Sequence, residues 1–276
     1  MAGMLYLVPT PIGNLSDISP RCRQTLAEAD FIAAEDTRVS LKLLNHLELK
    51  KSLVSYHEHN KAESGEKILA RLLAGETCAL VTDAGSPAIS DPGEDLVRLC
   101  AEHGVTVCAI PGPCALVTAL SISGLPTGRF TFEGFLSVNK KSRQEHLTGL
   151  KDETRTMIFY EAPHKLLATL QDLSAAFGAE RRISLCRELT KLHEEVRRTT
   201  LGGAAAYYAE NPPRGEFVLV VAGAEEPAEE GCTFEGALAL VRARMDEGLS
   251  TKDAVKQVAK LTGFAKNQLY DAILKG

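Results

Sequence analysis

The stretch CALVTDAGSPAISDPG, residues 78–93, combines the two patterns that decide the fold. Its first four residues are apolar, and a short apolar run bounded by turn residues is typical of a buried strand. Two aspartates, two prolines and two glycines follow within residues 82–93. The stretch therefore predicts a strand whose carboxyl end opens into a loop, and that loop either only turns the chain or holds a ligand.

Six further apolar runs are of the same kind, and amphipathic stretches lie between them. We predict strands at residues 5–8, 31–34, 78–81, 105–110, 156–160, 183–186 and 217–221. We predict helices at residues 20–29, 41–47, 61–73 and 164–176. This alternation predicts an α/β fold with much of its sheet parallel. Two helix starts carry expected caps, Ser19 before Pro20 and Asp91 before Pro92.

Composition shifts divide the chain into three expected parts. A basic, glycine-containing region around residues 128–151, with one candidate strand followed by a short helix, separates an N-terminal α/β domain, 1–125, from a second α/β domain, 126–224. The acidic stretch EEPAEEG, residues 225–231, is interpreted as a linker. A small helical module, 232–276, follows it. There Ser250 and Asp253 form a capping box and Gly263 ends a helix, which suggests a helix-turn-helix.

Charge, cysteine usage and hydropathy indicate where the protein is located and which contacts it lacks. The 276 residues carry a net charge of −5, but residues 250–276 hold five Lys and two Asp. Seven cysteines without a C-x-x-C pair are typical of a reducing cytoplasm. No apolar run approaches the ~18 residues of a membrane span, and the first residues lack a basic signal-peptide start. We therefore expect a cytoplasmic protein without a membrane contact. His57 and His59 are interpreted as a polar loop, and no metal site is expected.

Four predicted strands end in loops rich in glycine or proline. They are VPTPIGN (8–14), TDAGSP (82–87), IPGPCA (110–115) and YEAPHK (160–165). In a parallel sheet the carboxyl ends of strands meet at one edge, where ligands bind. Any one of these loops is more simply a turn, but four of them favour a ligand site. The chain has no Walker A motif, no G-x-G-x-x-G and no G-x-S-x-G. A P-loop, a Rossmann dinucleotide site and the common α/β-hydrolase nucleophile turn therefore lose support.

Nine motifs in the same order give the chain a specific resemblance. They are VPTPIGNLSDIS, AAEDTRVSLKLL, VTDAGSPAISDPG, IPGPCALVTAL, FEGFL, FYEAPHK, CRELTKLHEE, GEFVLVV and LSTKDAVKQVAKLTGFAKNQLYDAIL. With them the chain resembles the ribosomal RNA small subunit methyltransferase I family of the tetrapyrrole methylase superfamily. The resemblance implies a two-domain tetrapyrrole methylase-like fold with a cofactor cleft between the domains. It also implies S-adenosyl-L-methionine-dependent 2′-O-methylation of a cytidine in the decoding region of 16S rRNA, as naked rRNA or in the 30S subunit, by a homodimer.

The resemblance also implies site residues. For the cofactor it implies Pro11, Ile12, Gly13, Asp83, Ala84, Gly85, Ser86, Pro87, Ile89, Gly112, Pro113, Cys114, Ala115, Tyr160, Leu189, Gly215 and Glu216. Basic residues expected at the RNA are Lys140, Lys141, Arg143, Lys165, Arg197 and Arg198. A ribose hydroxyl is a poor nucleophile that gains from a base or a nearby cation. The candidates for that role, with no base assigned among them, are Glu35, Asp36, Arg38, Glu188 and Lys191.

Several alternatives stay open at this point. Glu35, Asp36 and Arg38 equally fit a local ion pair that closes a strand–helix turn, and Lys191 fits a phosphate contact. Each basic residue alone is more simply part of a solvated surface. The C-terminal helices either dock RNA or pack on the protein. Two other functions remain: a methyltransferase for a tetrapyrrole or another small molecule, and a cofactor-binding protein without catalysis.

Overall fold

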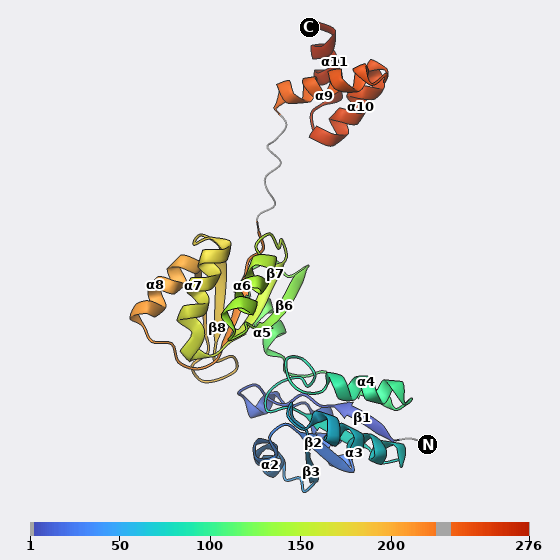
Figure 1. Cartoon of the computed structure of the whole chain (residues 1–276), viewed down its shortest axis with the longest axis vertical. Helices are drawn as coiled ribbons and strands as arrows, with labels where there is room; N and C mark the ends of the chain where they lie inside the picture. Colours follow the sequence, from blue (N-terminus) through green and yellow to red (C-terminus); the bar gives the residue numbers. More distant parts are fainter. Residues whose placement is uncertain (1–2, 225–232, 276) are drawn as a thin grey trace. The chain divides into compact units, whose positions relative to one another are not determined.

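The computed structural model describes residues 3–224 and 233–275, which form two compact units, Met1–Ala224 and Glu225–Gly276 (Figure 1). Each unit is described by itself. The predicted linker, 225–231, lies outside the described residues. Within those residues, no helix combines the length and the apolar character needed to cross a membrane.

The first unit contains a parallel sheet of five strands in the order β3-β2-β4-β1-β5. The strands are β1 Met4–Leu7, β2 Phe31–Ala34, β3 Ser52–Ser55, β4 Cys78–Val81 and β5 Thr106–Ala109. Successive side chains of a strand point to opposite faces, so each buried strand contributes side chains to two hydrophobic cores, one on each face of the sheet. The helices between these strands are α1 Pro20–Glu28, α2 Thr37–His46, α3 Lys61–Leu73 and α4 Glu94–Glu102, with the short 3₁₀ helix η1 Leu15–Asp17.

Each face of this sheet is covered by one pair of helices. Leu5, Phe31 and Leu80 form one core with residues of α3 and α4. Ile32, Ala79 and residues of α1 and α2 form the other. Since β1, β2 and β4 are parallel, the loops that follow their carboxyl ends lie at one edge of the sheet.

The second sheet has the order β6-β7-β10-β8-β9 and is mostly antiparallel, with β6 and β7 parallel. Its strands are β6 Phe130–Phe135, β7 Thr156–Glu161, β8 Arg182–Arg187, β9 Glu195–Thr200 and β10 Phe217–Val221. The helices that follow are α6 Lys140–Gly149, η2 Pro163–Lys165, α7 Leu166–Phe177 and α8 Leu201–Glu210. Met157, Phe159 and Leu219 pack with residues of α6, α7 and α8.

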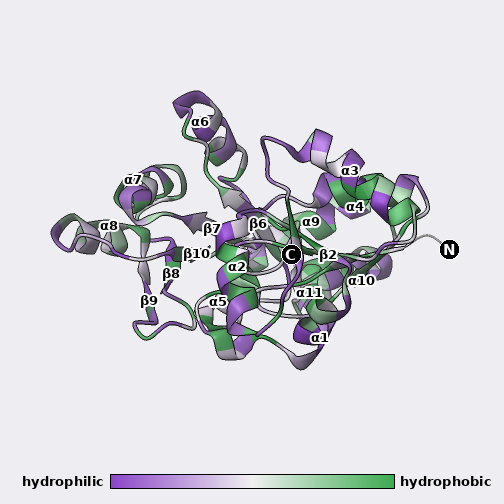
Figure 2. Ribbon diagram, turned by 90° about the horizontal axis from the view of Figure 1, so that it is seen from below, coloured by the Kyte–Doolittle hydropathy of each residue, from purple (hydrophilic) through white to green (hydrophobic). Residues whose placement is uncertain are grey.

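Helix α5, Ala115–Ser123, covers the opposite face of the second sheet. It follows β5 of the first sheet, yet Leu116, Ala119 and Leu120 pack against Ile158 and Val220. Its residues are mostly hydrophobic (Figure 2), as a helix buried on one sheet requires. The chain therefore passes from one sheet to the other through IPGPCA, before the boundary at residue 125, which stays a prediction.

The second unit contains α9 Phe234–Asp246, α10 Thr251–Thr262 and α11 Lys266–Lys275. The Ser250 hydroxyl accepts a hydrogen bond from the Asp253 amide at the start of α10, and Gly263 ends that helix at φ +75°. Val241, Val258 and Leu269 share one core. The predicted α/β fold and C-terminal helical module are both confirmed, with the cap and the glycine at the residues expected.

Candidate active site

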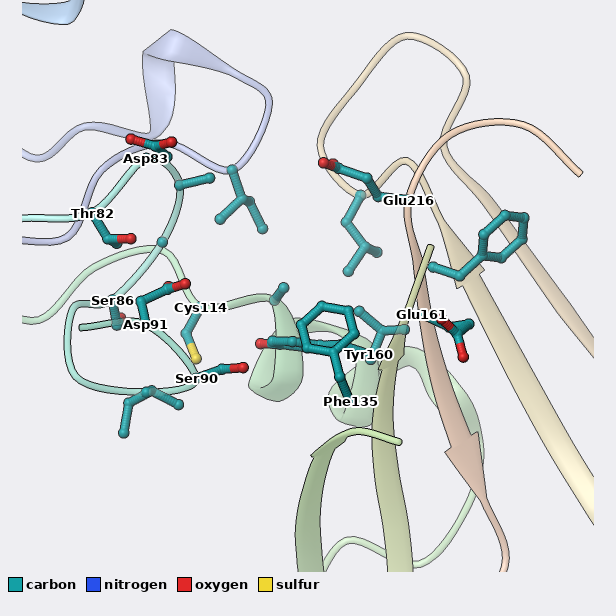
Figure 3. A pocket seen from close by; sticks show the side chains of 18 of the residues that line it. Thr82, Asp83, Ser86, Ser90, Asp91, Cys114, Phe135, Tyr160, Glu161 and Glu216 are labelled. Atoms are coloured by element: carbon teal, nitrogen blue, oxygen red, sulfur yellow. The ribbon is translucent and has the colours of Figure 1, made fainter. Parts of the chain in front are cut away.

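A pocket of about 480 Å³ lies between the loops at the strand ends of the first sheet and the second sheet (Figure 3). Its volume is within the ~300–1,000 Å³ of typical small-molecule sites. The predicted residues that line it are Ile12, Glu35, Asp83, Ala84, Gly85, Ser86, Ile89, Cys114, Ala115, Tyr160, Leu189 and Glu216. Thr82, Glu161, Ala162 and Pro163 also line it and lie in the loops TDAGSP and YEAPHK, which were expected to form a ligand site. The lining residues that were not predicted are Ser90, Asp91, Phe135, Cys186, Phe217 and Val218.

The glycine- and proline-rich loops of the first sheet are hydrogen-bonded to one another. The Thr10 amide donates to the Gly85 carbonyl over 2.9 Å, and the Gly85 amide donates back over 3.0 Å. The Ser86 hydroxyl donates to the Pro113 carbonyl over 2.9 Å. Gly85 has φ +93°, a conformation that favours glycine, so the shape of the turn itself accounts for a glycine here. These bonds hold three loops as one rim of the pocket.

Six predicted cofactor residues are not part of that lining: Pro11, Gly13, Pro87, Gly112, Pro113 and Gly215. A Cβ atom at Gly112 would lie 2.8 Å from Pro9, and one at Gly13 would lie 2.5 Å from Lys191 Cγ. A Cβ atom at Gly215 would lie 2.5 Å from Glu188. These three glycines therefore allow close packing of the chain on itself, and their contact with a cofactor stays a prediction.

Asp36 and Arg38 form a local ion pair. Arg38 donates from Nε and Nη2 to the Asp36 carboxylate, with the Nη2–Oδ2 distance 2.7 Å, and Asp36 also caps α2 by accepting from the Arg38 amide. The Arg38 hydrogen bonds lower the pKa of Asp36 to about 2. The interpretation as an ion pair that closes a strand–helix turn therefore fits both residues, and neither lines the pocket.

Glu188 and Lys191 are likewise engaged with their neighbours. Lys191 Nζ lies 2.9 Å from Glu188 Oε1 and 2.8 Å from Glu216 Oε2. Glu188 Oε1 also accepts from the Glu216 amide over 3.0 Å, and hydrogen bonding to Lys191 lowers the pKa of Glu188. These contacts join the β8–β9 loop to the start of β10, and both side chains lie outside the pocket lining.

The first-sheet side of the pocket is acidic. Glu35 follows β2, Asp83 follows β4, and Asp91 lies further along the same loop. Thr82 Oγ1 donates to Glu35 Oε2 over 2.8 Å, and the Asp36 amide donates to Asp83 Oδ1 over 3.1 Å. Burial raises the pKa of Asp83, and burial together with the charges of Glu35 and Asp83 raises that of Asp91 to about 6. We name Glu35, Asp83 and Asp91 the acidic wall.

The second-sheet side is aromatic and apolar. Tyr160 contacts Phe132 and Phe135 edge to face, with ring centroids 4.9 and 5.6 Å apart. The Tyr160 hydroxyl accepts a hydrogen bond from the Leu116 amide at the start of α5. Phe135 is 59% exposed, an unusual exposure for a large ring at a pocket. We name Phe135, Tyr160 and Val218 the aromatic wall.

Three of the basic residues predicted at RNA are held by the protein itself. Arg143 is only 14% exposed and donates to Asp172 and Thr169. Arg197 pairs with Glu195 and lies over the Tyr207 ring, 3.7 Å from its centroid. Arg198 donates to the carbonyls of Ile122 and Ser123.

The other three are less constrained. Lys140 and Lys141, at the start of α6, are exposed, and the nearest partner of Lys141 is Glu145 at 3.9 Å. Lys165 is half-buried in η2, next to Pro163 of the pocket lining. The interpretation as a solvated surface therefore does not apply to Arg143, and it stays open for the exposed Arg198 and for the lysines.

Comparisons with known proteins match the chain to one family over nearly its whole length. Residues 4–205 match the Tetrapyrrole (Corrin/Porphyrin) Methylases, and residues 235–276 match the RsmI C-terminal HTH domain. The chain is 49% identical to a ribosomal RNA small subunit methyltransferase I of Synechocystis sp. over 99% of this chain and 98% of the relative. It is 45% identical to a protein of that name from Pseudomonas aeruginosa, over 99% of this chain and 98% of the relative.

A solved structure shares the fold. Uroporphyrin-III C-methyl transferase from Thermus thermophilus, complexed with S-adenyl homocysteine, superposes with a TM-score of 0.55. The match covers 79% of this chain and 97% of that chain at 19% identity.

Proposed function

Because this chain belongs to the tetrapyrrole methylases and, within them, to the ribosomal RNA small subunit methyltransferase I family, we propose that it methylates the 2′-hydroxyl of a cytidine in the decoding region of 16S rRNA. Methylation of small-subunit rRNA is the coarser activity that membership of the family indicates. The cytidine and its 2′-oxygen are the finer part of the proposal. The observation that carries it is a pocket with an acidic and an aromatic wall, at the strand ends of a chain matched over 99% of its length.

The residues of the pocket fit S-adenosyl-L-methionine. This cofactor, when bound, supplies an activated methyl group on a positively charged sulfonium. The acidic wall suits its positive charges, and the aromatic wall offers flat faces to its adenine. Ala84, Gly85 and Ala115 have small side chains that let a ligand approach the backbone. The residues named here would bind the cofactor and exclude water from the reacting groups.

RNA is proposed to contact the three less constrained lysines, of which Lys140 and Lys141 are exposed and Lys165 is half-buried. Lys140, Lys141 and Lys165 lie on the elements that follow β6 and β7, whose ends form the aromatic wall. Phosphate contacts of this kind give affinity that falls with salt. The C-terminal module, with its five lysines in residues 250–276, is proposed as a further RNA contact. The proposal includes a cytoplasmic location, where rRNA is the substrate, and a homodimer, which light scattering would test.

A methyl-transfer assay with labelled S-adenosylmethionine tests the function. The acceptors are small ribosomal subunits from cells that lack the gene, naked rRNA, and a tetrapyrrole precursor. Label mapped to a cytidine 2′-oxygen of the rRNA supports the proposal. Label in the tetrapyrrole alone would replace it with small-molecule methylation. Cofactor binding with no transfer to any acceptor would favour a binding protein without catalysis.

A further inference from the structure

Strand β6 has one residue more than its pairing with β7 accommodates. Phe132 lies opposite Ile158 on β7. The next residue of β7, Phe159, lies opposite Gly134, so Glu133 is left without an opposite residue in this register. This is a β-bulge, which is rare between parallel strands and frequent at sheet edges and beside functional sites. Since β6 is parallel to β7 and lies at the edge of its sheet, the direction of the side chains after the bulge is informative.

The bulge determines on which face of the sheet Phe135 lies. Side chains alternate along a regular strand, so residues three apart point to opposite faces. Ile158 and Tyr160 are two apart and share one face of β7. The residues opposite them are Phe132 and Phe135, which are three apart and yet both contact the Tyr160 ring. Figure 3 shows Phe135 beside Tyr160 at the pocket. Without the bulge, Phe135 would lie opposite Glu161, on the face that α7 covers.

Burial does not explain this orientation of Phe135. The face that α7 covers holds the hydrophobic core around Phe159 and Leu219, where an apolar ring would be removed from water. On the face that it occupies, Phe135 is 59% exposed and lines the pocket. A bulge that served stability alone would direct the ring into the core. The exposed ring therefore points to a ligand as its partner.

Two features hold the bulge in place. Gly134 has φ +63°, in the left-handed region that favours glycine. Apart from its chain neighbours, no atom of the described residues would lie within 4 Å of a Cβ atom there, so backbone conformation and not space favours the glycine. The extra residue, Glu133, is tied to α6, because His146 Nε2 lies 2.8 Å from Glu133 Oε2. The Glu133 side chain is only 14% exposed, so the contact is shielded from water.

We propose that the bulge at Glu133 positions Phe135 to stack on the adenine of the cofactor. Glu133, Gly134 and His146 are then positioning residues, which act through Phe135 because none of the three lines the pocket. The extra residue sets the face, the glycine allows the backbone turn, and the contact with His146 fixes the turn against α6. The inference rests on the proposed function, since the adenine belongs to the cofactor proposed there.

The register supplies a test in which a deletion reverses the effect of a substitution. Valine favours a regular strand and disfavours φ +63°, so Gly134→Val should turn Phe135 to the opposite face. The Kd for S-adenosylhomocysteine should then rise about tenfold, as for the loss of one stacking ring. Deleting Glu133 in the same variant removes the extra residue and leaves Phe135 opposite Tyr160. The Kd should return to within about threefold of the wild type.

Gly178→Val is the matched control. Gly178 has φ +94°, has an open environment like that of Gly134, and is outside the pocket lining. This variant should lower thermal stability and leave the Kd for S-adenosylhomocysteine unchanged. It separates the cost of valine at a left-handed glycine from the effect on Phe135.

His146 supplies a second, milder test. His146→Ala removes the contact that holds Glu133 and should raise the Kd about threefold, as for the loss of one hydrogen bond. His146→Gln keeps an N–H donor and should recover part of that loss. In the protein that lacks Glu133, His146→Ala should have no effect on the Kd, because the contact is already absent.

A fluorescence signal distinguishes positioning from a general loss of structure. The chain has no tryptophan, so Phe135→Trp places a single reporter in the pocket. S-adenosylhomocysteine should quench its emission through stacking of the adenine. Adding Gly134→Val should abolish the quenching, and deleting Glu133 as well should restore it. Should Gly134→Val fail to fold, the same comparison with His146→Ala, which should weaken the quenching, takes its place.

Three results would overturn the proposal. They are a Gly134→Val variant that binds S-adenosylhomocysteine like the wild type, a folded double variant in which deletion of Glu133 restores nothing, and quenching that is the same in every variant. A wild type that does not bind S-adenosylhomocysteine would overturn the proposed cofactor together with this inference. That result is distinct from a wild type that binds and variants that bind equally well.

Discussion

The two walls of the pocket differ in almost every physical respect. The acidic wall comes from loops after parallel strands, carries three carboxyl groups, and includes a segment with strained backbone. The aromatic wall comes from β6, β7 and β10 themselves, and its rings contact each other edge to face. The difference indicates that the two walls have different roles. The acidic wall supplies negative charge, and the aromatic wall offers a flat surface on which a ring can stack.

The contacts behind each wall support these different roles. Behind the acidic wall, hydrogen bonds between loops hold the backbone, and the side chains of Glu35 and Asp91 share one hydroxyl. Behind the aromatic wall, α5 packs on the sheet and its Leu116 amide holds the Tyr160 hydroxyl. Changes in the acidic wall should therefore alter charge-dependent contacts with the ligand, whereas changes in the aromatic wall should alter stacking on its ring.

The largest effect expected in this comparison belongs to Phe135→Ala. Loss of a stacking ring costs about 1–3 kcal/mol per base, so the Kd for S-adenosylhomocysteine should rise about tenfold or more. Phe135→Tyr keeps the ring and should bind like the wild type. Isothermal titration calorimetry gives both values. An unchanged Kd with a raised KM for the ribosomal subunit would move Phe135 to the acceptor side of the pocket.

A smaller effect is expected from replacing Lys140 and Lys141 together by alanine. Both side chains are exposed, so the fold should be unaffected, and the KM for ribosomal subunits should rise about fivefold at physiological salt. The slope of log KM against log salt should fall by about one to two. Arg143→Ala is the contrasting variant, because it breaks the contacts to Asp172 and Thr169 and should lower thermal stability. If the double variant keeps the wild-type salt slope, these lysines do not touch RNA.

The acidic wall should also cost stability at neutral pH. The pKa of Asp91 is raised from 3.8 to about 6, so the folded protein keeps this proton to higher pH than the unfolded chain does. Stability therefore falls as the pH rises from about 4 through about 6. Asp91→Asn should be more stable than the wild type at pH 7, on the order of 1 kcal/mol for a half-buried group. Urea unfolding at pH 4 and pH 7 checks this, and a gain that is equal at both pH values would contradict it.

The smallest effect is expected from Glu35→Gln. Removing the negative charge of Glu35 takes away one of the causes that raise the pKa of Asp91. The fall of stability with rising pH, measured by urea unfolding, should then move to lower pH. Glu28→Gln, on the exposed side of α1, is the matched control. A shift to higher pH in Glu35→Gln would mean that another group sets the profile.

Much of the fold could be predicted because its central strands are buried on both faces. Residues 78–81 and 217–221 are continuous apolar runs, and each became a central strand with two neighbours. Strands β3 and β9 were not predicted. Both lie at sheet edges with one neighbour each, and the polar residues of β9 include Arg197 and Arg198. Edge strands need not be apolar on both faces, so their sequences lack the signal.

The site was predicted less completely, because its contacts join distant residues. Asp91 was interpreted as a helix cap from the pattern D-P-G-E, but α4 begins at Glu94 with Gly93 as its N-cap. This leaves the Asp91 side chain free for the pocket. Its neighbour Glu35 is brought near by the pairing of β2 with β4, which local sequence does not reveal. The pairing of Arg143 with Asp172, 29 residues away, is likewise invisible in the sequence, whereas Asp36 and Arg38 are close enough along the chain to suggest their pair.

The most direct test of the two-wall account is a crystal structure of the protein with S-adenosylhomocysteine. The account predicts the adenine against Phe135 and Tyr160, with the sulfur directed toward Asp91. An adenine held by the acidic wall, or a ligand bound outside this pocket, would contradict the different roles assigned to the two walls.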